Sequence, residues 1–413
     1  MTKPTFQLTK EHFLSGRSIL NGVIGDYLNQ QGSSLSVPMS LHATSEFSQP
    51  EQLDISNHLV IFLHGLTNTE NIWRLANSND DYGRRLQQHF GYTPLYLRYN
   101  TGLGLEENGI AFAELMESVI EQYPIELSQI TLVGFSMGGL ISRMAQAHAT
   151  QQNHQWISKF TNGFYIGTPH AGSPLEKLGS LATQAISRFP KPYIHQWADW
   201  ANIRSEGIQN LKHGLKQSPI DYHPQANHHF ISGGLSKEPS NKTSWLTKVA
   251  GDSLVRRSSA QPKDAPSNSK HQHFEHIAHL PLAYSEEVYQ QLHCWFSELE
   301  RPAEITQCSI ARETLTFLNH DQTETGHSTS EVIRDSIDLV KTGIDQTLNT
   351  VEKTHLEIAK EPFSILNRIP VVGPVAQTVD TIHSTISRGV YSSIRQATQL
   401  ADAASKQAVK LVK

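Results

Sequence analysis

Short apolar segments alternate with amphipathic helical segments between residues 54 and 300 of this 413-residue chain. The segments expected as strands are His58–Leu63, Thr93–Arg98, Gln129–Gly134, Gly163–Gly167 and His228–Ser232. Their nearly continuous apolar character predicts a parallel sheet that is covered on both faces. The segments expected as helices are Thr69–His89, Glu106–Gln122, Met137–Thr150 and Glu286–Glu298. Such alternation predicts an α/β fold with right-handed crossovers.

Composition excludes several classes of protein. The chain carries 34 Lys and Arg against 39 Asp and Glu, so its net charge of −5 gives no general attraction to nucleic acid. The longest apolar runs, such as Leu59–Leu63, are far shorter than the ~20 residues of a membrane span. The first residues lack the apolar core of a signal peptide, and two cysteines, Cys294 and Cys308, cannot form a disulfide framework. We therefore expect a cytoplasmic protein.

Changes of pattern along the chain predict its domain organisation. An aromatic-rich helical stretch interrupts the strand–helix alternation, and beyond it two apolar stripes at helical spacing are separated by three prolines. Two such helices predict an antiparallel α-helical hairpin. The expected regions are an N-terminal lead-in at 1–53 with a short helix at Ser18–Asn29, a catalytic domain at 54–300 with a cap at about 173–216, a linker at 301–327 and the amphipathic helical C-terminal region at 328–413.

The segment Gly134-Phe135-Ser136-Met137-Gly138 fits the pattern G-x-S-x-G and lies between a predicted strand and a predicted helix. This context is that of a nucleophile elbow, in which the serine occupies a sharp and strained turn. The turn also puts Ser136 at a helix N-terminus, whose partial positive charge favours a developing anion. Ser136 is therefore the predicted nucleophile.

A second polar loop, His64-Gly65-Leu66, follows the first apolar strand. Attack of a serine on an ester creates an oxyanion, which needs two N–H donors about 3 Å away. The residue after the nucleophile, Met137, supplies one, and we assign the other to Leu66, with Phe62–Gly65 as the alternative. We expect His64 and Gly65 to contribute to substrate binding.

These two motifs, their order, and the segment GTPHAGSP at Gly167–Pro174 resemble the α/β-hydrolase superfamily. The similar branch is that of esterases and lipases, including triacylglycerol lipases and GPI-inositol-deacylase-like proteins. The resemblance implies a central, mostly parallel sheet with helices on both faces, a helical cap over the site, and a triad of serine, acid and histidine in that order.

The resemblance also implies the other two members of the triad. Asp252 lies in a segment similar to the G-D-x-x-V loop of such lipases, with Asp264, Glu238 and Glu275 as alternatives. His279 lies in a segment similar to the final histidine loop of the family, with His276, His271 and His273 as alternatives. A serine needs such an imidazole to take its proton, and the imidazole needs a carboxylate to orient it.

The predicted function is that of a serine carboxylic-ester hydrolase, an esterase or lipase acting on hydrophobic acyl esters. Trp197 and Trp200 in the cap would line an apolar acyl pocket. The same triad would serve an acyltransferase or a thioesterase, and the third alternative is a hydrolase-fold scaffold. In a scaffold, 328–413 would bind a partner or a lipid or polyester granule. That region could also form a homo-oligomer. No dinucleotide fingerprint, P-loop or Cys/His zinc pattern occurs, so neither a cofactor nor a metal is predicted.

Overall fold

The structure is a computed structural model, in which the chain divides into two compact units. The first comprises Met1–Phe189 with Ile203–Glu324, and the second Pro190–Asn202 with Thr325–Lys413. The residues that the structure describes are 10–45, 52–75, 78, 80–173, 205–215, 220–234, 260, 262, 264–299, 306–312, 315, 318 and single residues between 334 and 399.

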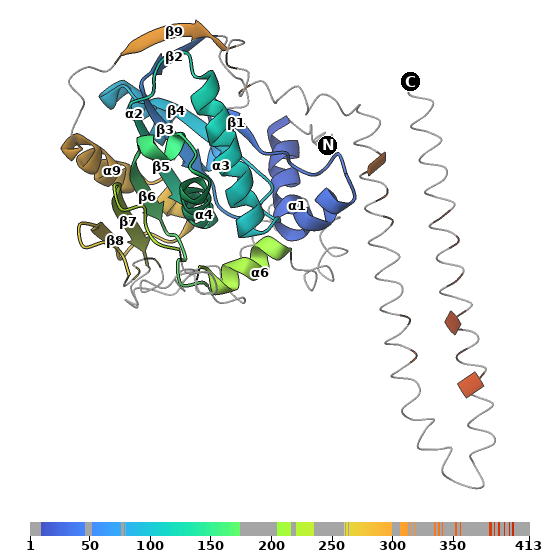
Figure 1. The fold of residues 1–413 in the computed structure, drawn as a ribbon. Coiled ribbons are helices and arrows are strands. Elements are labelled where there is room, and N and C mark those ends of the chain that lie inside the picture. Colours follow the sequence, from blue (N-terminus) through green and yellow to red (C-terminus); the bar gives the residue numbers. More distant parts are fainter. Residues whose placement is uncertain are drawn as a thin grey trace, which may run out of the picture. The chain divides into compact units, whose positions relative to one another are not determined.

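Seven strands form the main sheet of the first unit, in the order β1-β4-β3-β5-β6-β7-β8 (Figure 1). They are β1 (Ser40–His42), β3 (His58–Leu63), β4 (Thr93–Arg98), β5 (Gln129–Phe135), β6 (Phe160–Ile166), β7 (Asn227–Gly233) and β8 (Lys270–Phe274). β1 is antiparallel to β4, and the other neighbouring pairs are parallel. All five predicted strands are present, and the predicted mostly parallel α/β sheet is confirmed.

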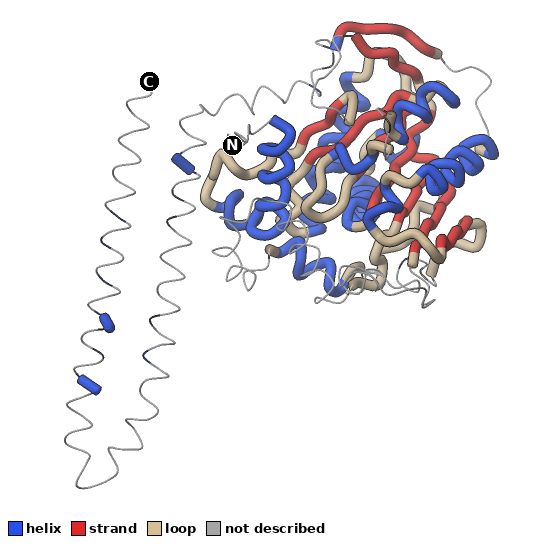
Figure 2. The backbone as a smooth tube through the Cα atoms, turned by 180° about the vertical axis from the view of Figure 1, so that it is seen from behind, coloured by secondary structure: helices blue, strands red, loops and turns tan. Residues whose placement is uncertain are grey.

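Helices lie on both faces of this sheet, as the view from behind also shows (Figure 2). The described helices of the unit are α1 (Lys10–Gln30), η1 (Glu70–Trp73), α2 (Tyr82–Phe90), α3 (Leu105–Gln122), α4 (Met137–Gln152), η2 (Trp156–Lys159), α6 (Glu206–His213), η5 (Leu280–Ala283) and α9 (Glu286–Glu298). The predicted helix at Thr69–His89 is wrong, because a 3-10 turn ends at Trp73 and a new helix starts at Tyr82. Asp81 starts that helix by accepting a hydrogen bond from the Arg84 N–H.

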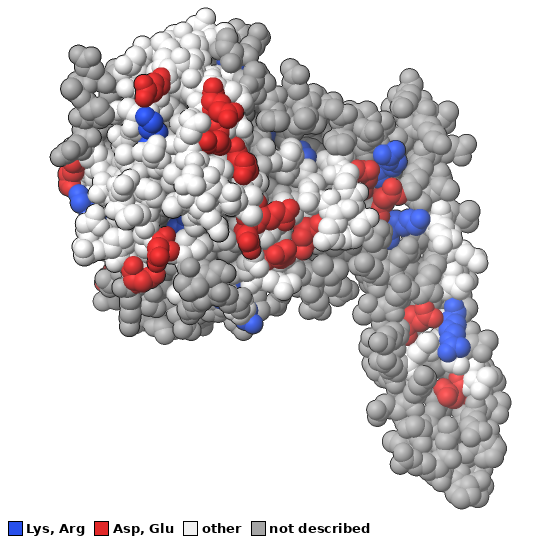
Figure 3. All heavy atoms as spheres, in the orientation of Figure 1, with Lys and Arg blue, Asp and Glu red and all other residues white. Residues whose placement is uncertain are grey.

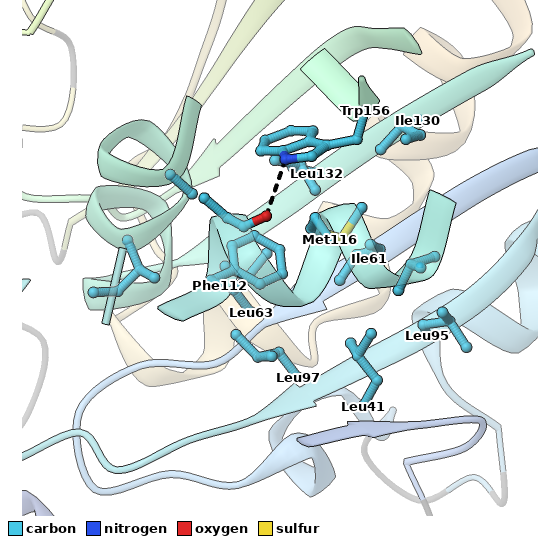
Figure 4. Packing of buried hydrophobic residues seen from close by; sticks show 14 of the residues in the cluster. Leu41, Ile61, Leu63, Leu95, Leu97, Phe112, Met116, Ile130, Leu132 and Trp156 are labelled. Atoms are coloured by element: carbon cyan, nitrogen blue, oxygen red, sulfur yellow. Dashed lines mark hydrogen bonds between the residues drawn. The ribbon is translucent and has the colours of Figure 1, made fainter. Parts of the chain in front are cut away.

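Alternate residues of the central strands enter two different hydrophobic clusters. Leu59, Ile61 and Leu63 of β3 pack in the same cluster as Phe112 and Met116 of α3 (Figure 4). The intervening Val60 and Phe62 belong to a second cluster with α2 and α9. In a strand that is buried on both faces, no side chain faces solvent. Its sequence is therefore continuously apolar rather than alternating.

The edges of the fold differ from the sequence prediction. Strand β9 (Gln307–Ala311) lies inside the predicted linker 301–327 and pairs antiparallel with β2 (Gln52–Ser56). The region predicted as a linker therefore contains a strand, whose backbone hydrogen bonds are satisfied by a segment about 250 residues earlier in the chain. The N-terminal helical segment is also longer than predicted, since α1 runs from Lys10 to Gln30, with a kink at Ile24, whose φ of −137° is not helical.

The apolar residues of both predicted C-terminal stripes lie outside the described residues, so the hairpin stays a prediction. The single residues described between 334 and 399 are helical. Among the helices that the structure describes, none combines the length and apolar character needed to cross a membrane. Cys294 and Cys308 are both free.

Candidate active site

Ser136 lies at the sharp turn between β5 and α4. Its backbone angles are φ 52° and ψ −117°, so a non-glycine residue is held in a region that is rarely populated. The Ser136 N–H donates to the Ile166 carbonyl at 2.8 Å, which ties the turn to the neighbouring strand β6. Strain of this kind persists only where surrounding contacts enforce it, and it is common at reactive residues.

The glycine two residues after the serine is required by close packing. A Cβ atom at Gly138 would lie 2.2 Å from the Leu63 carbonyl oxygen, a distance that real Cβ atoms essentially never show. The first turn of α4 therefore passes directly against the end of β3. The loop that follows β3, which contains the predicted oxyanion donor Leu66 and is called the oxyanion loop below, is brought next to Ser136 by the same contact. A Cβ at Gly65 would lie 3.1 Å from the Ser136 Cβ.

His279 is the histidine that reaches Ser136. Its Nε2 atom lies 3.0 Å from the Ser136 Oγ, although 143 residues separate the two in the chain. The His279 ring packs on Phe135, with ring centroids 4.9 Å apart, and a Cβ at Gly167 would lie 3.0 Å from its Nδ1 and Cε1 atoms. Gly167 has φ 60°, which suits a residue without a side chain.

The protonation state of His279 suits a general base. Burial lowers the pKa of His279 from 6.5 to about 3. The imidazole is therefore neutral at neutral pH, and Nε2 can accept a hydrogen bond from the Ser136 hydroxyl. A carboxylate at Nδ1 would raise this pKa by stabilising the imidazolium.

The alternative histidines lie in other surroundings. His276 is exposed and its Nε2 lies 2.7 Å from a Glu287 carboxylate oxygen. His273 shares a hydrogen bond of 2.7 Å with the Ser232 hydroxyl, and His271 stacks on Phe230. Within the part of the chain that the structure describes, none of these three rings is bonded to Ser136.

The predicted acid, Asp252, lies outside the described residues, as does the alternative Glu238. Asp264 and Glu275 are described and are both exposed. Among the described residues, no carboxylate is bonded to the His279 ring. The third member of the triad therefore stays a prediction.

The loop after β3 contains the second predicted oxyanion donor, Leu66. Neither the Leu66 N–H nor the Met137 N–H donates to any protein group that the structure describes, whereas the neighbouring Thr67 N–H donates to the Thr101 hydroxyl at 3.2 Å. Thr67 has φ 63°, a strained value for a β-branched residue. The Asn68 side chain also donates to the Leu66 carbonyl at 3.0 Å. The loop is thus held in a defined shape that leaves the Leu66 N–H without a protein acceptor among the described residues, and the Met137 N–H at the start of α4 is likewise without one.

The side chain of His64 points into the protein. Its ring stacks on Tyr99 at 4.5 Å, and its Nδ1–H donates to the Gly65 carbonyl at 3.0 Å. Burial lowers the pKa of His64 to about 4, so this ring is neutral as well. The Tyr99 hydroxyl donates to the His64 carbonyl at 2.7 Å. These contacts orient the backbone of the oxyanion loop. The expected contribution of His64 to substrate binding stays a prediction.

Several groups beneath the site were not predicted from the sequence. Glu70, which starts η1 directly after the oxyanion loop, forms a fully buried ion pair with Arg98 at the end of β4. Thr101 lies three residues beyond Arg98 and holds Thr67. A Cβ at Gly22 of α1 would lie 2.4 Å from the Thr67 Cγ2. Isolated polar residues in separate segments carry no local pattern, so no sequence signal would have joined them.

The cap residues Trp197 and Trp200 lie outside the described residues. At the start of the cap, His170 of the GTPHAGSP segment is buried, and its Nδ1 lies 3.1 Å from an Arg143 Nη1. The Arg143 guanidinium also lies over the Tyr222 ring, 3.7 Å from its centroid. Burial, reinforced by the charge of Arg143, holds the pKa of His170 well below its usual value. This neutral, enclosed histidine is a structural part of the loop.

A serine at a strained strand-to-helix turn, bonded to a histidine from the loop after the last strand of a mostly parallel sheet, is the arrangement of the α/β-hydrolase fold. Residues 54–191 match the family described as "Putative serine esterase (DUF676)". The match confirms the predicted resemblance to esterases and lipases, and with it the prediction of an enzyme that hydrolyses ester bonds. No curated protein sequence matches the chain significantly.

Solved structures with a similar fold include three hydrolases. The mature lipase BlEst2 of Bacillus licheniformis is 16% identical, with a TM-score of 0.41 over 62% of this chain and 97% of the lipase. The esterase Pf2001 of Pyrococcus furiosus is 15% identical, with a TM-score of 0.36 over 59% and 81%. The thioesterase RedJ of Streptomyces coelicolor is 11% identical, with a TM-score of 0.38 over 59% and 86%.

Proposed function

We propose that this protein is a serine carboxylic-ester hydrolase that acts on hydrophobic acyl esters through an acyl-enzyme intermediate. The observation that carries the proposal is the 3.0 Å contact between the Ser136 Oγ and the His279 Nε2 at a strained strand-to-helix turn. A serine hydroxyl becomes nucleophilic when a neighbouring base takes its proton. The neutral state of His279 supports that role.

The reaction proceeds in two half-reactions. The Ser136 Oγ attacks the acyl carbonyl while its proton passes to the His279 Nε2, and the N–H groups of Leu66 and Met137 donate to the oxyanion. The imidazolium then protonates the leaving alcohol as the C–O bond breaks. A water attacks the acyl-enzyme with His279 as base, which releases the carboxylic acid and restores the serine. Asp252 is the proposed partner of the His279 Nδ1–H.

The substrate class and the domain roles belong to the same proposal. Trp197 and Trp200 of the cap would contact a hydrophobic acyl chain. The region 54–300 would supply the chemistry, and 328–413 would pack on itself, associate with a second copy or contact a hydrophobic surface. Because β9 pairs with β2, a truncation that tests the C-terminal region should end after residue 324 rather than after residue 300.

The proposal is tested by labelling the protein with a fluorophosphonate probe and by measuring the turnover of p-nitrophenyl esters from C2 to C16. Ser136→Ala and His279→Ala should lose labelling and turnover. Two matched controls should keep both: Ser142→Ala, a buried serine of α4 that accepts a hydrogen bond from Gln146, and His276→Gln, the neighbouring histidine.

Each outcome of this experiment has a definite meaning. A wild-type protein that is folded but neither labels nor turns over any ester would overturn the hydrolase proposal and favour the scaffold alternative. Labelling with faster turnover of thioesters than of esters, or acyl transfer to an added alcohol, would favour the thioesterase or acyltransferase alternative. Loss of activity in His276→Gln with retention in His279→Ala would exchange the two histidines.

A further inference from the structure

A group of three potential metal ligands lies at the C-terminal end of α4, opposite the end that carries Ser136. Glu114 belongs to α3, His148 to the last turns of α4, and His154 to the connection between α4 and η2. One ligand atom from each residue lies within 4.8 Å of the other two. The helix rise of 1.5 Å per residue puts His148 roughly 18 Å along α4 from Ser136, so this group is separate from the active site.

The two distances from the Glu114 carboxylate to the imidazoles match those of a coordination sphere, and the two imidazole atoms lie within 4.8 Å of each other. The Glu114 Oε1 lies 3.4 Å from the His148 Nε2 and 3.6 Å from the His154 Nε2. Zinc–nitrogen and zinc–oxygen bonds of about 2.0–2.1 Å in tetrahedral geometry separate neighbouring ligand atoms by roughly 3.3 Å. A single ion could therefore bind all three atoms with small side-chain rotations.

The backbone around His154 is fixed by three independent contacts. Asn153 ends α4 in the left-handed conformation, and the His154 N–H donates back to the Ala149 carbonyl at 2.9 Å. The Glu117 carboxylate accepts hydrogen bonds of 2.8 and 2.9 Å from the Gln155 N–H.

The third contact comes from Trp156, whose indole N–H donates to the Ala113 carbonyl at 3.1 Å, next to Glu114 in α3 (Figure 4). The helix that carries Glu114 therefore also holds the connection that carries His154. A site whose ligands are positioned in this way loses little conformational entropy on binding.

Charge and burial also favour a cation here. The helix α3 contains five Glu residues and no Lys or Arg, and acidic side chains gather over the face where it lies (Figure 3). The His148 and His154 side chains are only 19% and 11% exposed, whereas Glu114 is 61% exposed. The two imidazoles are thus held by their surroundings, while the carboxylate side stays open to ions and water.

We propose that Glu114, His148 and His154 form a zinc-binding site that clamps α3 to the C-terminal end of α4. Two imidazole nitrogens and one carboxylate oxygen suit Zn²⁺ among the common divalent ions, because Mg²⁺ and Ca²⁺ prefer oxygen ligands alone. The remaining coordination positions face solvent and would hold water. The bound ion stabilises the helix that begins at the nucleophile, and this inference does not depend on the proposed esterase activity.

The surroundings also set the expected strength of binding. The His154 Nδ1 is buried and has no hydrogen-bond partner among the described residues. Metal-bound histidines normally donate this second N–H to an acceptor, and loss of such a partner weakens binding by about 10–100-fold. We therefore expect micromolar affinity rather than the tighter binding of closed structural zinc sites.

The test is calorimetric titration of the EDTA-treated, dialysed full-length protein with ZnCl₂ at pH 7.5. We expect one equivalent of zinc in the micromolar range and a rise in melting temperature of a few degrees at saturating zinc. His148→Ala, His154→Ala and Glu114→Ala should each weaken this binding, by about 100-fold or more for the histidines. The matched control is His276→Gln, which removes a histidine that pairs with a single carboxylate and should leave the zinc equivalent unchanged.

Two results would overturn the inference: a wild-type protein that binds no equivalent of zinc in this range, or an equivalent that persists in all three variants. Circular dichroism without metal checks that each variant is folded. Should one of them fail to fold, the visible spectrum of Co²⁺ bound to the wild type supplies a second measurement. An absorption typical of nitrogen and oxygen ligands in tetrahedral geometry supports the site, and an octahedral aqua-ion spectrum refutes it.

Discussion

The buried ion pair between Glu70 and Arg98 gives a prediction that can be worked out from the structure. The Glu70 side chain is fully buried, and the Arg98 Nε donates to its Oε2 at 3.1 Å. We expect Glu70→Gln, which keeps the shape of the side chain and removes its charge, to destabilise the protein strongly.

The magnitude follows from the pKa of Glu70. Burial by itself would raise this pKa, but the charge and hydrogen bonds of Arg98 outweigh burial and lower the pKa from 4.5 to about 2. At 1.36 kcal/mol per pKa unit, this shift corresponds to about 3 kcal/mol in the free energy of unfolding. Breaking a buried pair by removing one partner typically costs ~3–5 kcal/mol, which agrees.

The sign of the pH dependence follows from the lowered pKa. The contribution of Glu70 is fully present above its unfolded value of 4.5 and is lost as the pH falls toward about 2. The difference between wild type and Glu70→Gln should therefore be largest at pH 7 and decrease to roughly half near pH 3.

The assay is urea unfolding followed by tryptophan fluorescence, from pH 7 to the lowest pH at which the wild type is folded. Glu286→Gln is the matched control, because Glu286 forms a similar pair with Arg85 at 2.7 Å but is 53% exposed. Exposed pairs contribute about 0–1 kcal/mol. A loss below ~1 kcal/mol in Glu70→Gln at pH 7, or a loss that does not change with pH, would refute the reasoning.

Three further predictions concern the active site. Gly138→Ala places a Cβ against the Leu63 carbonyl, so we expect a lower melting temperature and turnover reduced by about 100-fold through displacement of the nucleophile; unchanged turnover would contradict the packing argument. Thr101→Val removes the acceptor of the Thr67 N–H, so we expect kcat to fall by about 10-fold with little change in KM. The control Thr101→Ser keeps the hydroxyl and should retain wild-type kinetics. Equal kinetics of the two variants would exclude a positioning role for Thr101. Fluorophosphonate labelling should slow at acidic pH as His279 is protonated. Asp252→Asn should move the midpoint of that loss to lower pH, toward the His279 pKa of about 3 that burial alone sets. A midpoint that stays in place would exclude Asp252 as the partner of His279.

Local patterns predicted the centre of the fold well. The strands β3 and β4 begin and end where the apolar runs do, and α9 matches its predicted bounds. These elements are specified by residues next to one another, because a buried parallel strand must be continuously apolar and a nucleophile elbow must follow such a strand. The error at Thr69–His89 arose where a capping residue, Asp81, restarts a helix inside a periodic stretch.

The peripheral strands could not be predicted from local patterns. The edge strand β8 has the sequence KHQHF, which contains almost no apolar residue, and β9 depends on pairing with β2. Edge strands are stabilised by hydrogen bonds to a neighbour rather than by burial of their own side chains, so their sequences are weakly constrained.

The sequence by itself determined the class of fold, the serine elbow and its order relative to the oxyanion loop, because these depend on contiguous residues. The tertiary structure decided which of several neighbouring histidines meets Ser136, that Glu70 and Arg98 pair beneath the oxyanion loop, and that Glu114, His148 and His154 converge. Each of these depends on distances through space between segments far apart in the chain. Such distances are set by the packing of strands and helices and leave no periodic signal in the sequence.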